Sequence, residues 1–191
     1  MAPVPPGDGP AFRRGRLLVA SPTLMDENFT RTVVLMLEHS PEGALGLVLN
    51  RPTEIVAREV LPSPLADALP ERELVHEGGP VQPEAVIVLA DFSDPASAAS
   101  ITVGSVGVVD PNDDALDLSD RVRAVRAFGG YAGWGAGQLE REITEGAWID
   151  VEAATDDVFT GAPEALWRRV LDRKGGAFRL FARMPEDPSL N

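Results

Sequence analysis

The residue types and spacing best suited to chemistry lie in residues 129–140, where five glycines surround two large aromatic side chains. Glycine adopts positive φ angles and lets another chain approach closely. A sequence typical of a helix follows, and N–H groups at the beginning of a helix can hold an anion. We therefore predict a stiff turn that shapes a hollow surface for a ligand or partner, formed by Gly130, Tyr131, Gly133, Trp134, Gly137 and Gln138.

The same glycines have a purely structural interpretation, in which they let Tyr131 and Trp134 pack tightly against a neighbouring strand. Gly133, Gly135 and Gly137 do not have the spacing of a dinucleotide-binding loop, and no strand–helix–strand unit surrounds them. Both interpretations remain open from the sequence.

A second candidate is the tripeptide Asn50-Arg51-Pro52, at the end of an apolar stretch. Asn side chains bind nearby backbone and Pro stops a strand, so the default expectation is a structural corner. The guanidinium of Arg51 can also hold a carboxylate or phosphate through two parallel hydrogen bonds. Because no lysine lies near, Arg51 is the best single candidate for an anion contact.

The only histidines are His39 and His76, each beside a glutamate, Glu38 and Glu77. Neighbouring residues of a strand point to opposite faces, so neither pair can easily chelate a metal. A zinc site would need three or four ligands that converge. We therefore predict no metal, and polar side chains that cap strand ends.

Two other segments suggest chemistry only superficially. The acidic segment 110–114 lacks the glycine of a calcium loop, where Ala115 stands, and has Arg121 in place of the closing glutamate, so we expect a solvated turn. Ser21, near Asp26, lacks the G-x-S-x-G elbow of a hydrolase, and we expect it to stabilise a turn. No catalytic residue and no cofactor is predicted.

Composition restricts the class of protein further. The 191 residues suit one domain, and 30 acidic against 17 basic side chains give a net charge of −13. That charge repels phosphate backbones, so direct nucleic-acid binding is not expected. The chain has no cysteine, no signal-peptide pattern and no apolar run of about 18 residues, from which we predict a cytoplasmic protein with no membrane contact.

These residues must be positioned by a chain that is rich in strands first and mixed later. The apolar patterns predict strands over 16–20, 31–39, 44–50, 74–77, 85–90 and 148–151, and either a strand pair or one bent strand over 101–109. They predict helices over 54–61, 138–145 and from Pro163 to the pair Gly175-Gly176. Residues 122–131 are ambiguous, and we favour a strand that enters the glycine segment. This order predicts an α+β fold.

Proline and glycine in residues 1–12 predict a flexible leader, and residues 184–191 a frayed tail. One domain is expected over residues 13–183.

Four blocks resemble the YqgE/AlgH family of bacterial proteins, which has no established activity. The first two are Gly15 to Pro22 with Asp26 and Phe29, and Thr32 to His39. The others are Gly43 to Pro52 with Gly78-Gly79-Pro80-Val81, and Gly130 to Trp134 with Gly137 to Glu140 and Trp148. The resemblance implies an α+β fold whose mixed sheet has a small β-barrel-like core flanked by helices. It also brings the label of transcriptional regulator, which the charge and the lack of a helix-turn-helix pattern oppose.

The leading hypothesis is a non-enzymatic binding or regulatory protein that uses the glycine–aromatic surface for an unknown protein or small-molecule partner. The alternative is a hydrolase or transferase acting on an anionic small molecule, with His39, Asp26 or Arg51 and a glycine turn that cradles an oxyanion or phosphate. A third hypothesis, direct DNA regulation, predicts a salt-sensitive affinity for duplex DNA.

Overall fold

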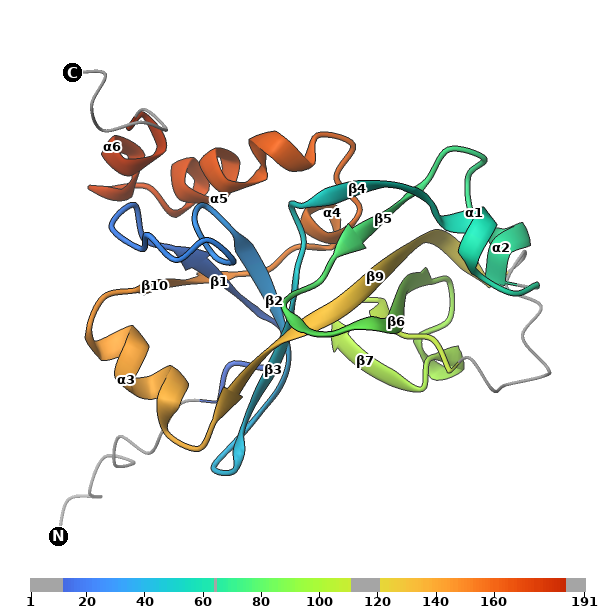
Figure 1. Cartoon of the computed structure of the whole chain (residues 1–191), viewed down its shortest axis with the longest axis horizontal. Helices are drawn as coiled ribbons and strands as arrows, with labels where there is room; N and C mark the ends of the chain where they lie inside the picture. The colour runs from blue at the N-terminus through green and yellow to red at the C-terminus, as the bar shows by residue number, and fades with distance from the viewer. Residues whose placement is uncertain (1–11, 64, 111–120, 185–191) are drawn as a thin grey trace, which may run out of the picture.

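The structure is a computed structural model that describes residues 12–63, 65–110 and 121–184 (Figure 1). Almost all of the predicted leader and tail, and of the acidic segment 110–114, lies outside the described residues. Phe12, at the end of the predicted leader, packs edge-on against His39, with ring centroids 5.5 Å apart.

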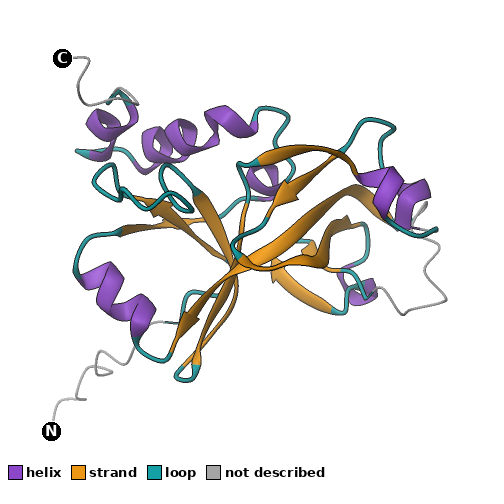
Figure 2. Cartoon of the chain, in the orientation of Figure 1, coloured by secondary structure: helices purple, strands orange, loops and turns teal. Residues whose placement is uncertain are grey.

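Strands form most of the fold (Figure 2). The first five are β1 (Arg16–Ala20), β2 (Val33–Ser40), β3 (Gly43–Val48), β4 (Pro52–Val56) and β5 (Leu74–Glu77). The other five are β6 (Val81–Phe92), β7 (Ser100–Val103), β8 (Val106–Val108), β9 (Val122–Gly135) and β10 (Trp148–Glu152).

The helices are short and lie at the periphery of the sheet. They are α1 (Ala57–Val60), α2 (Leu65–Ala68), α3 (Gln138–Thr144), α4 (Thr155–Val158), α5 (Leu166–Lys174) and α6 (Phe178–Ala182), with 3-10 turns at Pro95–Ser97 and Pro163–Ala165. Among the described residues, no helix has the length and apolar character needed to span a bilayer.

The strands follow the order β10-β1-β2-β3-β9-β6-β8-β7, with β4 and β5 branching from β9. The β5–β9 pair is parallel and the other pairs are antiparallel. This arrangement confirms the α+β class and the mixed sheet flanked by helices. The ends β10 and β7 do not pair with each other, so the sheet is not closed into a barrel.

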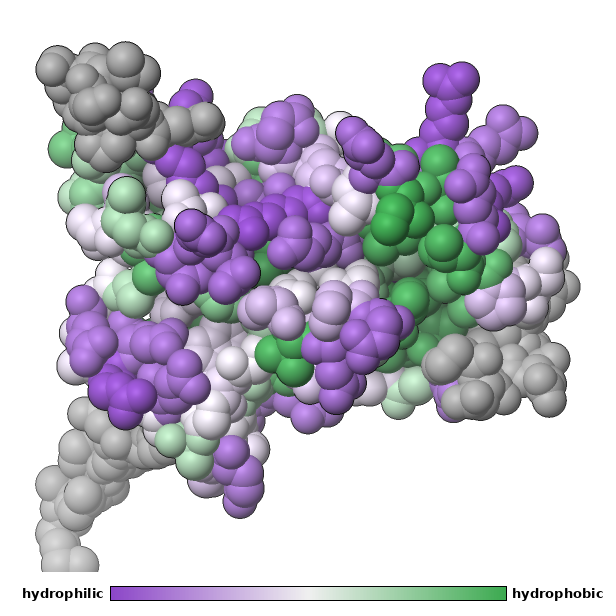
Figure 3. Space-filling view, viewed as in Figure 1, coloured by the Kyte–Doolittle hydropathy of each residue, from purple (hydrophilic) through white to green (hydrophobic). Residues whose placement is uncertain are grey.

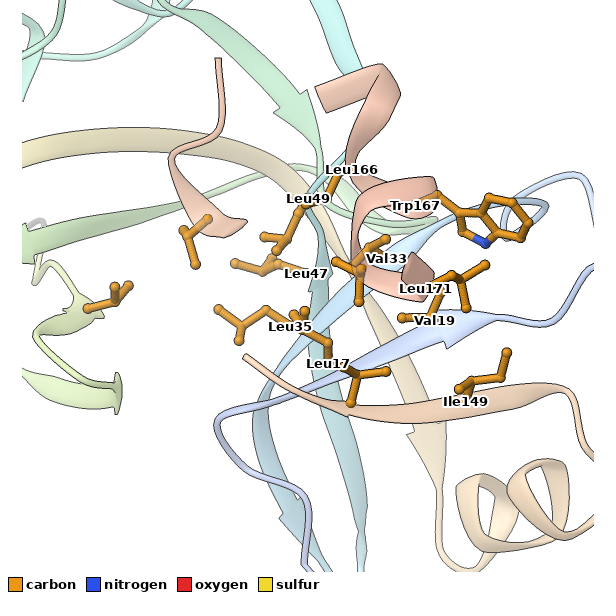
Figure 4. Packing of buried hydrophobic residues seen from close by; sticks show 14 of the residues in the cluster. Leu17, Val19, Val33, Leu35, Leu47, Leu49, Ile149, Leu166, Trp167 and Leu171 are labelled. Carbon is orange, nitrogen blue, oxygen red and sulfur yellow. The ribbon is translucent and has the colours of Figure 1, made fainter. Parts of the chain in front are cut away.

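The largest apolar core lies between α5 and one face of the β1–β2–β3–β10 region (Figure 4). Side chains at alternate positions of the strands point to this face, as the period of a strand requires. The strands contribute Leu17, Val19, Val33, Leu35, Leu47 and Ile149, the residue after β3 is Leu49, and α5 contributes Leu166, Trp167, Val170 and Leu171.

The opposite face of the same strands packs against α3. Leu18, Val34, Met36, Trp134, Leu139 and Trp148 are among its buried side chains. A third cluster, which includes Leu69, Val75 and Phe92, lies where α1 and α2 cover β6 and β9. Near it, Figure 3 shows an apolar area over α1 and the adjoining end of β4, where Ile55 and Val60 are exposed.

Most predicted elements agree with the structure, and two do not. The helix predicted over residues 54–61 is wrong in its first half, because β4 continues to Val56 and α1 has only four residues. The turn predicted in the glycine segment is also wrong over most of its length. β9 runs through to Gly135, and the turn is confined to Ala136 and Gly137.

Candidate anion-binding site

The glycines of β9 are explained by the closeness of neighbouring backbone. Gly130 has φ +68°, and a Cβ atom there would lie 2.5 Å from the carbonyl oxygen of Gly79. A Cβ at Gly79 would in turn lie 2.2 Å from the carbonyl carbon of Tyr131. Two segments of the chain therefore cross at this point with no room for side chains, and packing requires glycine in both.

Trp134 lies in the interior of the protein. Its side chain is 6% exposed and stacks on Phe29, with ring centroids 6.2 Å apart, and meets Trp148 edge-on at 5.9 Å. Both indole N–H groups donate to the same carboxylate oxygen, Oε2 of Glu142, at 2.9 Å. Buried indoles need such an acceptor, so this carboxylate holds the aromatic cluster in place.

Gln138 belongs to the same network. Its Nε2 donates to Oε1 of Glu142 at 2.9 Å, and its Oε1 accepts the Gly135 N–H at 3.1 Å. Gly137 precedes α3 with φ +67°, Gly133 is exposed, and the half-buried Tyr131 packs against the α5-side core. Sequence reasoning missed Glu142, although its spacing of four from Gln138 on a helix is a usable signal.

Asn50 and Arg51 lie elsewhere, at a cavity of about 260 Å³. The residues that line it come from three separate segments: Thr30 and Arg31, Asn50 and Arg51, and Glu164, Trp167 and Arg168. The structure thus separates the two halves of the predicted ligand surface. The half that lines a cavity is the Asn50–Arg51 half.

Asn50 fixes the backbone around this cavity. Its Oδ1 accepts the Val33 N–H at 2.8 Å, and its Nδ2 donates to the Arg31 carbonyl at 2.9 Å. This is the structural corner that the sequence predicted. Arg31 has φ +55°, a left-handed conformation that is uncommon for a long side chain and is found often at functional sites.

Arg31 lies over Trp167, with the guanidinium carbon 4.7 Å from the ring centroid. Its Nη2 also donates to the carbonyl of Met184 at 2.9 Å. These contacts hold its positive charge beside an aromatic wall.

Arg51 lies across the cavity and is anchored to the loop before β2. Its Nη2 donates to the carbonyls of Glu27 and Thr30, at 3.0 and 3.4 Å. Its Nη1 forms a long ion pair with Oε1 of Glu77, at 3.9 Å, which is beyond hydrogen-bond length. These bonds use two of the five N–H groups of a guanidinium, so Arg51 retains donors for a ligand.

Arg168 is exposed on α5, and no hydrogen bond or ion pair joins its side chain to any other residue that the structure describes. Three guanidinium groups and one carboxylate, from Glu164, therefore line one cavity of a protein whose net charge is −13. Sequence reasoning missed Arg31 and Arg168 because they lie far from Arg51 along the chain.

The structure does not bring His39 to Arg51, as the hydrolase hypothesis would need. His39 is buried, with Nε2 2.6 Å from Oε1 of Glu140, and its Nδ1 accepts the Arg13 N–H at 3.1 Å. It stands six residues along β2 from Val33, which binds Asn50, a span of about 20 Å. Asp26 is exposed and accepts the Asn28 N–H within its own turn, at 2.9 Å. The hydroxyl of Ser21 likewise accepts the Thr23 N–H, at 3.3 Å, as a turn residue does.

His76 is a buried structural residue. Its Nδ1 lies 2.9 Å from the Leu49 carbonyl and donates to it. Burial lowers the pKa of His76 below its ordinary value of 6.5, and the charge of Arg126 lowers it further. His76 pairs with Pro52 and packs on Phe128, whereas His39 lies beside α3, so the two imidazoles do not converge. Within residues 12–63, 65–110 and 121–184, no three His, Asp or Glu side chains gather as a metal site would require.

A second cavity, of about 320 Å³, lies beside Glu73 and Arg126. Arg126 is buried there, and its guanidinium donates to Glu73 at 2.7 Å and to the carbonyls of Val158 and Thr160 at 2.9 and 3.1 Å. Because its charge is already balanced by Glu73, this cavity is a weaker candidate for an anion than the Arg51 cavity.

The comparisons with known proteins cover nearly the whole chain. The profile of the AlgH-like family matches residues 17–179. A UPF0301 protein of Streptomyces coelicolor is 46% identical over 183 residues, covering 93% of this chain and 94% of that protein. A UPF0301 protein of Chlorobium limicola is 38% identical over 195 residues, covering 94% and 96%.

Two solved structures share the fold. A crystal structure of a protein from Corynebacterium diphtheriae matches with a TM-score of 0.82 and 25% identity, covering 96% of this chain and 95% of that one. The solution structure of the AlgH protein from Pseudomonas aeruginosa matches with a TM-score of 0.67 and 28% identity, covering 94% and 98%.

Proposed function

The chain belongs to the AlgH-like family, as its resemblance to YqgE/AlgH proteins indicated, and we propose that it is a non-enzymatic binding or regulatory protein that recognises an anionic group of its ligand or partner. The carboxylate or phosphate binds in the cavity lined by Arg31, Arg51 and Arg168, which we call the arginine pocket. The observation that carries the proposal is the convergence of these three side chains in an otherwise acidic protein.

Guanidinium groups suit this role because their planar donors match the oxygens of carboxylates and phosphates. The hydrogen-bond donors of the pocket differ in how firmly the protein holds them. Arg51 is anchored by Glu27 and Thr30, whereas Arg168 has no bond to another described side chain and can adjust to the ligand. The residues Gly130, Tyr131, Gly133, Trp134, Gly137 and Gln138 support the fold in this proposal and do not contact the ligand.

Binding is favoured over hydrolysis by the residues that line the pocket. Among the described residues that line it, the one hydroxyl is that of Thr30, which donates to the Asp26 carbonyl at 2.7 Å, and none is a histidine. A nucleophile needs an adjacent base, which Thr30 lacks. The proposal places the protein in the cytoplasm, in keeping with a sequence without cysteine. It involves no direct contact with nucleic acid.

The test is a titration of ¹⁵N-labelled protein with inorganic phosphate and with succinate, followed by NMR. Arg168→Gln is the cleanest variant because it removes a charge without breaking a bond to another described residue. We expect it to weaken binding of both anions by about tenfold, since a charged hydrogen bond contributes on the order of 1.5 kcal/mol.

Arg51→Gln should weaken binding similarly. Its matched control is Arg141→Gln, which removes an exposed arginine from α3, on the opposite face of the sheet. Equal affinities in Arg168→Gln, Arg51→Gln and Arg141→Gln would overturn the proposal.

A further inference from the structure

The cavity beside Glu73 and Arg126 lies along a strand edge that has no partner strand. Phe128 of β9 pairs with β6 on one edge and with β5 on the other, and β5 pairs with β9 only at Phe128 and Gly129. Among the described residues, no strand pairs with the β5-side edge before Phe128. Residues 122–126 of β9 line the cavity there, and its volume of about 320 Å³ is enough for a small ligand.

Arg126 is a buried charge with hydrogen-bond donors left over. Its side chain is 9% exposed. Its Nε donates to Oε1 of Glu73 at 2.7 Å, and its Nη1 donates to the carbonyls of Val158 and Thr160 at 2.9 and 3.1 Å. A guanidinium has five N–H groups, so these bonds leave both N–H groups of Nη2 without a partner among the described residues. Oε2 of Glu73 likewise accepts no hydrogen bond from any residue that the structure describes.

Nη2 of Arg126 and Oε2 of Glu73 are both accessible. Within the described part of the chain, every buried side-chain nitrogen and oxygen has a hydrogen-bond partner, so these two atoms, which have none, are not sealed off. Each belongs to the same guanidinium or carboxylate as one atom of the 2.7 Å bond, and both therefore flank that bond. The cavity thus offers a donor and an acceptor next to each other, on an ion pair whose charges cancel.

The chemistry of the cavity selects a neutral ligand. The carboxylate of Glu73 repels an anion, the guanidinium of Arg126 repels a cation, and a purely apolar ligand would leave both groups desolvated and unpaired. A trans peptide bond points its C=O and N–H in opposite directions, whereas a primary carboxamide or a ring lactam presents both on one edge. Leu69, Val125 and Phe159 also line the cavity and suit an attached ring.

We propose that this cavity binds a small neutral molecule through a primary carboxamide or a ring lactam. The C=O of the ligand accepts from Nη2 of Arg126, its N–H donates to Oε2 of Glu73, and its ring packs on the apolar walls. The site shares no lining residue with the arginine pocket, so the proposal is independent of the proposed function.

The test compares benzamide, benzoate and N,N-dimethylbenzamide, which share one ring. Each is titrated into ¹⁵N-labelled protein and followed by NMR at the Arg126 Nε–H and the backbone amides of residues 122–126, so that an anion in the arginine pocket is not counted. We expect benzamide to bind at least about tenfold more tightly than the others. Benzoate has no donor and is repelled by Glu73, and N,N-dimethylbenzamide has no N–H. Equal affinities, or no shift with benzamide, would overturn the inference.

Glu73→Gln tests the acceptor. Glutamine keeps an oxygen for Nε of Arg126, but its second terminal atom is a nitrogen that donates. We expect the affinity for benzamide to fall about tenfold and the preference to reverse toward benzoate, because two donors and an unbalanced guanidinium suit a carboxylate. Poor folding cannot produce such a reversal.

The matched control is Glu71→Gln, which removes an exposed charge two residues earlier and should keep the preference for benzamide. A preference for benzamide that survives Glu73→Gln, or that is lost equally in Glu71→Gln, would rule the inference out. The comparison of the three ligands on the original protein needs no variant, so it decides the matter even if Glu73→Gln fails to fold.

Discussion

Glu142 binds three side-chain donors at once: the indoles of Trp134 and Trp148 and the amide of Gln138. This carboxylate contributes more to the free energy of unfolding than its half-buried position indicates, because removing it leaves two indole N–H groups without their acceptor. Its role is structural, because it holds the two indoles and the amide in place around one carboxylate.

The substitution Glu142→Ala should lower the free energy of unfolding by about 2 kcal/mol, since each buried donor left unpaired costs on the order of 1 kcal/mol or more. Urea unfolding followed by tryptophan fluorescence measures this. Glu145→Ala, at an exposed position that follows α3, is the control and should change the free energy little. Similar values for the two variants would contradict the role given to Glu142.

His76 makes stability depend on pH in a defined direction. Its pKa is lowered in the folded protein by burial and by Arg126, while Leu49 and Glu73 act in the opposite sense with smaller effects. The unfolded chain therefore binds a proton below about pH 6.5 that the folded protein resists, so stability is lost as the pH falls below that value.

His76→Asn keeps a donor for the Leu49 carbonyl and removes the titrating group. We expect the free energy of unfolding of this variant to vary less between pH 5 and pH 7 than that of the original protein. Denaturant titrations at several pH values measure the difference. Parallel pH profiles for the two proteins would show that His76 does not carry this dependence.

At the scale of elements, β9 illustrates what the sequence could and could not predict. Most strand positions follow from their apolar patterns, and α3 and α5 follow from their helical spacing. The glycine segment was predicted as a turn because glycine disfavours strands when local preference alone acts. Here pairing with β3 and the close crossing at Gly79 prevail, and neither is visible before the partner strands are known.

The same limit applies to the site. Asn50 and Arg51 could be selected from their residue types and their place after an apolar stretch. Arg31 and Arg168 could not, because the pocket joins three segments that only the fold brings together. Tyr131 and Trp134 stood out in the sequence as aromatic residues among glycines. Whether such rings bind a ligand or pack inside the protein depends on their burial, which the sequence does not specify.

The crossing at Gly130 gives a prediction with an internal control. Gly130→Ala must adopt φ near +68° and also place a methyl group 2.5 Å from the Gly79 carbonyl. Gly137→Ala must adopt φ near +67° but has no atom within 4 Å of the new methyl group. Gly130→Ala therefore combines backbone strain with a steric conflict, whereas Gly137→Ala has the backbone strain alone.

We expect Gly137→Ala to lower the free energy of unfolding by about 1 kcal/mol and Gly130→Ala by about 3 kcal/mol. Thermal and denaturant unfolding of both variants measure this, and the difference between them isolates the steric conflict. If Gly130→Ala is no less stable than Gly137→Ala, the two segments that cross at Gly130 have room to separate.

At the scale of the whole molecule, charge is distributed unevenly. The net charge of −13 is opposed locally by the basic helices α5 and α6, which cover the largest core. Composition predicted an acidic protein with its arginines scattered along the sequence, and it could not show that Arg31, Arg51 and Arg168 line one pocket. The sequence could predict the α+β class. It could not predict that the sheet stays open, because that depends on which strands pair with each other.

Because β9 pairs with β6 through its first half and with β3 through its second, one continuous strand is shared by both regions of the sheet (Figure 1). Neither region can melt while the other keeps its ladder intact, so the molecule should denature cooperatively in a single step. All three tryptophans lie in the cores around β1, β2 and β10, whereas far-ultraviolet circular dichroism samples every strand. The two signals should share one midpoint, and the amides of β9 should exchange with solvent only through global unfolding.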